Sequence, residues 1–175
     1  MTHDLEARLD ALANLHRDRG ILMDTNVLLL FLFACFKPQM IGRKRLEKYT
    51  NDDGELLKRY VQKFGRILTT AHVLTETSNL ARQIVDREMR LELMKSFYPL
   101  FCLNRSDSFK HCVVEGKTLI TWQFVRLGLT DSCLAALVRR RKRLLLTDDL
   151  DLYQASVVAG DAINFTHMRE AAGLI

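Results

Sequence analysis

Short apolar runs that end in polar residues recur along the chain, and residues 21–26 are the clearest example. Three apolar residues after Gly20 lead directly into Asp24, Thr25 and Asn26, and a second apolar run follows. An apolar run of this length, bounded by turn residues, is typical of a strand buried on both faces of a parallel sheet. Residues 144–149 repeat the pattern. Because parallel sheets place their chemistry outside the carboxyl ends of the strands, both runs predict polar side chains at one sheet edge.

The spacing of apolar positions elsewhere predicts helices that alternate with these strands. Leucines three and four residues apart make residues 4–18 an amphipathic helix, and we expect residues 1–19 to pack on the domain. The predicted strands are residues 20–24, 66–70, 144–147 and 162–165. The predicted helices are residues 28–36, 55–64, 71–85, 87–101, 109–114, 119–124, 130–143 and 150–158, with a turn at 51–54 and Thr130 as an N-cap. This alternation indicates one three-layer α/β/α domain over residues 1–175.

Composition and charge fit an ordinary globular protein with a mild basic excess. The chain has 175 residues, 48% of them hydrophobic and 27% charged, and a net charge of +5. That balance argues against a disordered chain and favours polyanionic partners. The N-terminus lacks an apolar segment, and residues 27–36 are too short to cross a bilayer, so we expect a soluble, cytoplasmic protein without a membrane partner.

The cysteines show no metal-ligand spacing. Each of the four lies beside apolar or aromatic residues, which predicts buried free thiols in a reducing compartment: Cys35, Cys102, Cys112 and Cys133.

Four acids fall at the ends of predicted elements: Asp24, Glu76, Asp131 and Asp149. Carboxylates that converge at one sheet edge repel each other unless a cation neutralises them. Mg²⁺ prefers oxygen ligands, and such a site can activate water for an in-line phosphoryl displacement. Three of these acids also have a purely structural interpretation. Asp24 could form a turn, Glu76 could be a solvated helix residue, and Asp131 could complement a helix dipole.

Taken together, these motifs resemble the PIN domain, a family of metal-dependent ribonucleases that includes toxins of bacterial toxin–antitoxin pairs. The resemblance covers about residues 20–167 and rests on Asp24-Thr25-Asn26, Leu129-Thr130-Asp131 and Leu146-Thr147-Asp148-Asp149-Leu150-Asp151. Segments 40–64 and 104–122 are longer than in the smallest toxins. The family implies a parallel sheet of four or five strands, Mg²⁺ or Mn²⁺ as cofactor, and hydrolysis of RNA phosphodiester bonds.

The resemblance also implies roles for individual residues. Asp24, Glu76, Asp131 and Asp149 would be the catalytic, metal-binding acids. Asn26, Thr147, Asp148 and Asp151 would support them in a first or second shell, and register leaves Asp148 open against Asp149 as the ligand. The family further implies an antitoxin partner protein and a homodimer.

Three alternatives stay open from the sequence. The basic run Arg139, Arg140, Arg141, Lys142 and Arg143 is either a solvated helix end or an RNA-phosphate contact. His72 is either a neighbour of the acids or a surface histidine. The whole domain is either an endoribonuclease or a catalytically degenerate PIN domain that binds RNA or protein, and DNA is an alternative substrate.

Overall fold

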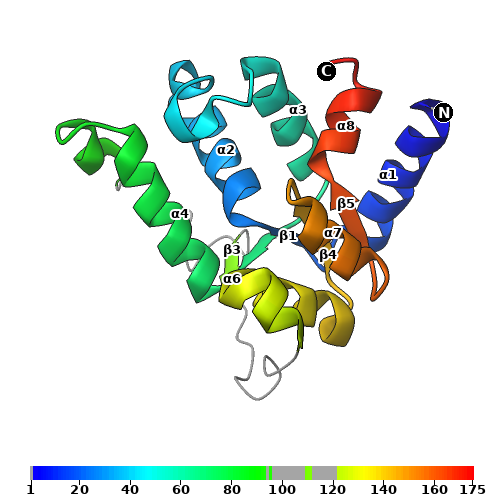
Figure 1. Ribbon diagram of the computed structural model, residues 1–175. Helices are drawn as coiled ribbons and strands as arrows, with labels where there is room; N and C mark the ends of the chain where they lie inside the picture. The colour runs from blue at the N-terminus through cyan, green and yellow to red at the C-terminus, as the bar shows by residue number, and fades with distance from the viewer. Residues whose placement is uncertain (1, 94, 96–108, 112–121) are drawn as a thin grey trace.

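Five parallel strands form the centre of the computed structural model, which describes residues 2–93, 95, 109–111 and 122–175 (Figure 1). The strands are β1 (Ile21–Met23), β2 (Ile67–Thr69), β3 (Phe109–His111), β4 (Leu144–Thr147) and β5 (Ala162–Asn164), in the order β3-β2-β1-β4-β5. Every pair of neighbours is parallel. All carboxyl ends therefore lie at one edge of the sheet, with β1 in the middle.

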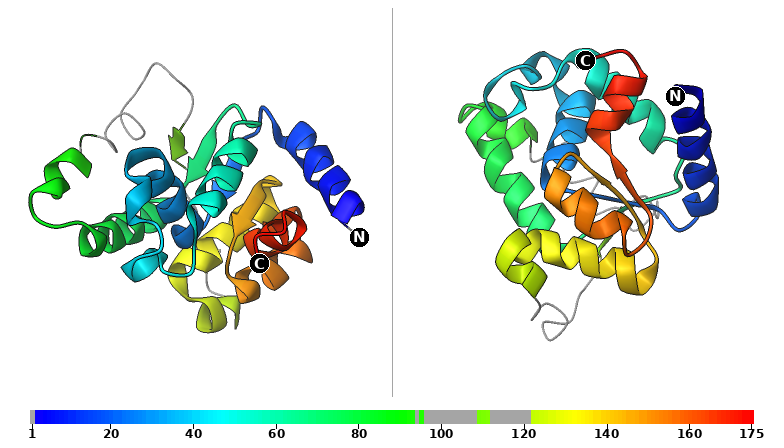
Figure 2. Two further views of the ribbon diagram at one scale, coloured as in Figure 1. Left: turned by 90° about the horizontal axis from the view of Figure 1, so that it is seen from above. Right: turned by 45° about the vertical axis from the view of Figure 1, so that its right-hand side comes forward.

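Helices cover both faces of this sheet (Figures 1 and 2). They are α1 (Thr2–His16), α2 (Thr25–Phe36), α3 (Asn51–Val61), α4 (Ala71–Ile84), α6 (Trp122–Arg141), α7 (Leu150–Val157) and α8 (Phe165–Ala171), with 3-10 turns η1 (Pro38–Met40) and η2 (Lys44–Leu46). Helix α2 packs against α3 and α4, whereas α6 packs against α7. The three-layer α/β/α prediction is confirmed.

The central strands are buried from solvent, as their unbroken apolar runs predict. Every residue of β1 and the three leucines of β4 have no exposed surface. Most of α2 is buried as well, from Val27 to Ala34, with Phe31 only partly covered. Burying a side chain of this size stabilises a fold by roughly 1.5–3 kcal/mol, so this layer dominates the core.

A polar N-cap separates four of the strands from the helix that follows each. Asp24 caps α2, Thr70 caps α4, Asp149 caps α7 and Asn164 caps α8, and each side chain accepts a backbone N–H of its helix. A side chain at this position satisfies a donor that the first helical turn leaves unpaired. Four helix N-termini, with their positive dipole ends, therefore lie at the same sheet edge.

The predicted turn at residues 51–54 is wrong, because these residues form the first turn of α3. Thr50 and Asp53 make a capping box, in which each side chain accepts the other residue's backbone N–H. Polar residues that favour turns also favour the ends of helices, so this composition alone did not separate the two outcomes. Gly54 fits inside the helix because a Cβ there would stand 3.0 Å from the side chains of Ala34 and Ile41.

Other sequence predictions need correction in the second half of the chain. Residues 109–111 form strand β3 rather than the start of a helix, and α8 was not predicted. Within α6, Gly128 leaves helical geometry (φ 77°) and separates two helical segments, so a helix does start after Gly128 as predicted, but Thr130 lies in its first turn and is not its cap. Much of the predicted helix 87–101 falls outside the described residues, although 89–93 are helical.

Two further predictions concern the cysteines and the N-terminal helix. Cys133 is a buried free thiol as expected, but Cys35 is free and exposed, and the other two cysteines lie outside the described residues. Helix α1 packs on the domain, where it contacts α8 and where the Tyr60 hydroxyl donates to the Leu9 carbonyl at 3.1 Å. Among the described residues, no helix is long and apolar enough to cross a membrane.

Candidate metal centre at the carboxyl edge of the sheet

Asp24 sits at the end of the central strand with both carboxylate oxygens engaged. Oδ1 accepts the Val27 N–H at 2.7 Å, and Oδ2 accepts the Thr147 hydroxyl and the Asp148 N–H, the latter at 2.9 Å. The residue is only 3% exposed. Burial raises the pKa of Asp24 in spite of these three donors, and the charge of Asp148 adds to the rise. A bound cation at this position would favour the ionised form.

Glu76 reaches the same edge from α4. Its Oε2 accepts the Thr25 hydroxyl at 2.9 Å, which joins the second turn of α4 to the first turn of α2. The side chain is otherwise exposed. Thr25, a residue of the predicted motif without a predicted role, thus orients Glu76.

Asp131 lies close enough to the other three acids to be affected by their charge. Its pKa rises from 3.8 to about 7, first because the side chain is half-buried and then because Asp24, Asp149 and Glu76 are negative neighbours. The helix that carries Asp131 ends directly before β4, so it runs antiparallel to that strand and starts at the carboxyl edge. Three acids from separate elements therefore act electrostatically on Asp131, and the role of all four as a metal site stays a prediction.

Asp149 and Asp148 follow the same strand but face different surroundings. Asp149 is exposed, caps α7 through the Leu152 N–H at 2.7 Å, and contributes to the charge at Asp131. The Asp148 carboxylate instead accepts Lys48 at 2.6 Å, the Tyr49 hydroxyl at 2.8 Å and the Thr166 hydroxyl at 2.6 Å.

These contacts decide which of the two acids is available. Burial alone would raise the pKa of Asp148, but its three hydrogen-bond donors outweigh burial and lower it. The charge of Asp148 is thus paired with the Lys48 ammonium, whereas Asp149 has no described cationic partner and one oxygen without a described hydrogen bond. The geometry favours Asp149 over Asp148, and it adds Lys48, Tyr49 and Thr166 as supporting residues that the sequence did not indicate.

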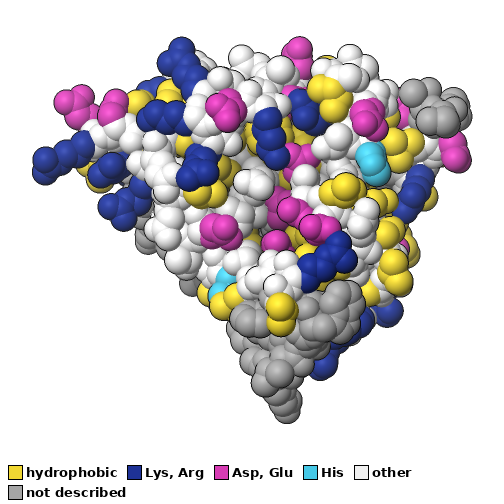
Figure 3. All heavy atoms as spheres, in the orientation of Figure 1, with side chains coloured by type: hydrophobic (Ala, Val, Ile, Leu, Met, Phe, Trp, Pro, Cys, Tyr) yellow, Lys and Arg dark blue, Asp and Glu magenta, His cyan; other side chains and the backbone are white. Residues whose placement is uncertain are grey.

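The four converging acids are set apart by their lack of cationic partners. In the described part of the chain, none of them lies within ion-pair distance of a Lys, Arg or His side chain. Neighbouring acids are paired: Asp148 with Lys48, and Asp151 with Arg126. Space-filling in Figure 3 shows acidic side chains gathered near the centre of this face, with basic side chains toward its margins.

The donor set fits a hard divalent cation that keeps part of its water shell. Over the described residues, no group of three or more His, Cys, Asp or Glu side chains stands in an arrangement that could hold a metal ion by itself. Mg²⁺ does not require such a group, because it is usually held by one or two carboxylates together with waters and substrate phosphate. Asp24, Glu76, Asp131 and Asp149 are the residues that would hold it.

The remaining predicted site residues differ in whether they contact the acids. Thr147 bridges the acids, since its hydroxyl donates to Asp24 and accepts the Asp149 N–H at 3.0 Å. Asn26 is exposed in the first turn of α2 and makes no described hydrogen bond. Asp151 forms an exposed ion pair with Arg126, so it is engaged away from the four acids.

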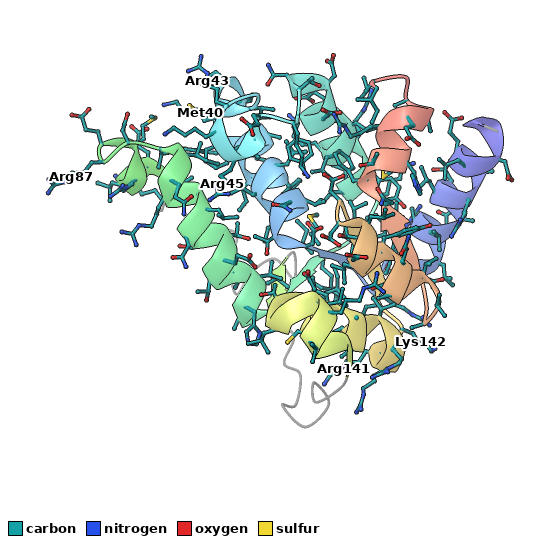
Figure 4. All side chains as sticks on the ribbon, viewed as in Figure 1. Met40, Arg43, Arg45, Arg87, Arg141 and Lys142 are labelled. Carbon is teal, nitrogen blue, oxygen red and sulfur yellow. The ribbon has the colours of Figure 1, made fainter. Side chains whose placement is uncertain are left out.

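The predicted RNA-binding run lies away from the acids. Residues 139–141 form the last turn of α6, and residues 142 and 143 connect it to β4 at the opposite edge of the sheet. The Arg143 guanidinium donates to the Arg19 carbonyl at 3.0 Å. Figure 4 shows Arg141 and Lys142 at that end of the helix. RNA contact by this run stays a prediction, without support from the placement of the acids.

A different basic surface lies at η2 and beyond the C-terminal end of α4, and we define the Arg43 surface as Arg43, Arg45 and Arg87. All three are exposed, and Figure 4 places them along η2 and beyond the end of α4. Lys44 anchors this segment, since its ammonium donates to the Gln83 and Ile84 carbonyls at 3.0 and 2.9 Å. A cation at the last carbonyls of α4 also complements the helix dipole.

Comparison with protein-family models, curated proteins and solved structures found no match to this chain.

Proposed function

We propose that the chain is a divalent-metal-dependent endoribonuclease of the PIN type. The observation that carries the proposal is the convergence of Asp24, Glu76, Asp131 and Asp149 without a paired cation, at an edge where acids outside the group are neutralised. Mutual repulsion makes this arrangement costly for the free protein, and a divalent cation removes the cost. Bound there, Mg²⁺ or Mn²⁺ would polarise a phosphodiester and activate water.

The chain's own residues supply the rest of the site. Thr147 and the Asp148 backbone fix the orientation of Asp24, and Thr25 fixes that of Glu76. The Asp149 oxygen that caps α7 keeps its carboxylate at the rim. The exposed arginines of the Arg43 surface, at η2 and beyond the end of α4, suit a polyanionic strand that extends away from the acids. An antitoxin partner, a homodimer and a cytoplasmic location stay predictions.

The test is cleavage by purified protein of single-stranded RNA, duplex RNA and single-stranded DNA, with Mg²⁺, Mn²⁺ or EDTA. We expect metal-dependent cleavage of RNA that falls more than about 100-fold in Asp24→Asn, since loss of even outer-shell partners of a metal costs 10–100-fold. Asparagine remains a good N-cap, so α2 should stay folded.

Asp151→Asn is the matched control, because it removes an acid at the same edge that is already paired with Arg126. Its cleavage should stay near that of the unaltered protein. Undiminished cleavage by Asp24→Asn, or cleavage that survives EDTA, would refute the proposal. Metal-independent RNA binding without cleavage would favour a binding module, and cleavage of DNA alone would change the substrate.

A further inference from the structure

A pocket of about 340 Å³ opens beside Glu76, between α4 and the second part of α6. It is lined by Ala71, His72, Thr75, Glu76, Asn79 and Thr130. The α4 residues recur at three- and four-residue spacing and so form one face of the helix. Thr130 comes from the helical segment that restarts after the break at Gly128. We call this the α4–α6 pocket, and its volume falls in the usual range for small-molecule sites, roughly 300–1,000 Å³.

The pocket is continuous with the acid cluster. Glu76 lines the pocket and is also one of the negative neighbours of Asp131. Thr130 lines the pocket and directly precedes Asp131 in the chain. A ligand whose phosphate lies at the acids can therefore extend into the pocket without leaving the same two helices.

The chemistry of the lining suits a neutral, polar ring. It contains no Lys or Arg, and Glu76 makes it unfavourable for an anion. Asn79 is exposed and makes no hydrogen bond within the described residues, so its carboxamide offers both a donor and an acceptor. The Thr75 hydroxyl donates to the Ala71 carbonyl at 2.8 Å, which leaves its oxygen free to accept.

His72 adds a flat surface to this lining. The ring is half-buried and its Nδ1 lies 3.6 Å from the buried thiol of Cys133, so contact with α6 restrains it. Unpaired RNA bases stack on histidine and aromatic rings and form hydrogen bonds through their edges. A side-chain amide pairs best with adenine, which presents one donor and one acceptor side by side.

We propose that the α4–α6 pocket binds an unpaired nucleobase, preferably adenine, next to the phosphodiester held at the acid cluster. The inference rests on the proposed nuclease function for the identity of the strand as RNA. A base stacked in an A-form duplex cannot stack on His72, and the deep, narrow major groove keeps its edge out of reach of Asn79. The pocket therefore selects single-stranded RNA and biases the position of the cut.

The first test is independent of cleavage. The protein in EDTA is titrated with adenosine, guanosine, cytidine, uridine and inorganic phosphate, and the ¹H–¹⁵N spectrum is followed. We expect adenosine to shift the Asn79 side-chain amide and the Thr130 backbone amide most strongly, and phosphate to leave both in place. The Asn79 resonances are assigned from their loss in Asn79→Ala. Absence of these shifts, or equal shifts with phosphate alone, would overturn the proposal.

The second test is the base preference at the nucleotides that flank the cut in a randomised single-stranded RNA. We expect one flanking position to favour adenine, and Asn79→Ala to reduce that preference by about tenfold, the discrimination usual for a bidentate contact. Asn79→Trp, which fills the pocket, should abolish the preference. Asn14→Ala, the same substitution on exposed α1, should leave it intact.

The two tests separate the pocket from the nuclease. If the protein cuts nothing, the proposed function fails, and the titration still shows whether the pocket binds a base. If it cuts with the same base pattern before and after Asn79→Ala, the nuclease stands and the pocket proposal is wrong.

Discussion

The hydroxyl of Thr147 donates a hydrogen bond to the carboxylate of Asp24, across the ends of neighbouring strands β4 and β1. The same hydroxyl accepts the Asp149 N–H at 3.0 Å. One buried oxygen thus fixes the positions of two of the four acids relative to each other. Register between the two strands, set by Met23 opposite Leu146, brings Thr147 beside Asp24.

Thr147→Val should therefore loosen the acid cluster. The substitution keeps the shape but removes the donor to Asp24 and the acceptor for Asp149, and leaving buried partners unsatisfied costs about 1–3 kcal/mol. Urea denaturation followed by circular dichroism measures the loss. Thr147→Ser keeps the hydroxyl and should lose less. Equal stability of the Val variant and the unaltered protein would show that this hydrogen bond contributes nothing.

The raised pKa of Asp131 predicts that metal-free protein loses stability as pH rises. Between the ordinary pKa of 3.8 and the folded value of about 7, the folded state keeps a proton that the unfolded state has lost. Stability then falls through this window, and the full penalty is present above pH 7. Asp131→Asn removes it and should stabilise the protein at pH 8 by about 1–2 kcal/mol, after allowance for solvent screening.

Denaturation in EDTA at pH 4 and pH 8 checks this prediction. Asp131→Asn should gain little at pH 4, where the carboxyl is protonated in the folded state. Asp18→Asn, at an exposed acid outside the cluster, controls for the removal of a charge. A gain in Asp131→Asn that is the same at both pH values would contradict coupling of this carboxyl to the other acids.

The sequence predicted the central strands and the acids because both depend on local pattern. A strand buried on both faces has to be apolar throughout, and the polar residue that follows it has to cap the next helix, as Asp24 and Asp149 do. The polar residues at the carboxyl edge of the sheet could therefore be predicted from residues that are adjacent in the chain. The order of the strands was not predicted, because it depends on contacts between segments that are distant in the chain.

The supporting residues could not be found this way, because their partners are distant in sequence. Tyr49 donates to Asp148, 99 residues away, and Arg169 pairs with Asp53, 116 residues away. No spacing rule connects such positions. Asp53 was assigned to a turn for the same reason, since its role as a buried partner becomes visible only once α8 lies against α3.

The buried ion pair of Asp53 and Arg169 gives a separate prediction about stability. The Arg169 guanidinium donates to both Asp53 oxygens at 2.7 and 3.0 Å and to the Lys48 carbonyl at 3.0 Å, and both side chains are buried. Removal of one partner leaves a buried charge uncompensated, so Arg169→Leu should destabilise the protein by about 3–5 kcal/mol. Urea denaturation measures this loss.

The double variant Asp53→Leu/Arg169→Leu distinguishes the pair from simple packing. It removes both charges and should cost less than Arg169→Leu alone. Arg82→Leu, at an exposed arginine on α4, should change stability by no more than about 0.5 kcal/mol. If the double variant is less stable than the single one, Asp53 stabilises the fold without Arg169, through its capping box with Thr50.

The two basic surfaces make opposite predictions for RNA binding. The Arg43 surface lies at η2 and beyond the end of α4, whereas Arg141 and Lys142 lie at the end of α6, near the opposite edge of the sheet (Figure 4). In the non-cleaving Asp24→Asn background, Arg43→Ala/Arg45→Ala should weaken binding of single-stranded RNA. It should also reduce the slope of log K against log salt by about 1.4, or about 0.7 for each lost phosphate contact. Arg141→Ala/Lys142→Ala removes the same charge and should leave the slope unchanged. A reduced slope in the second variant only would place the strand along α6 and across the opposite edge of the sheet.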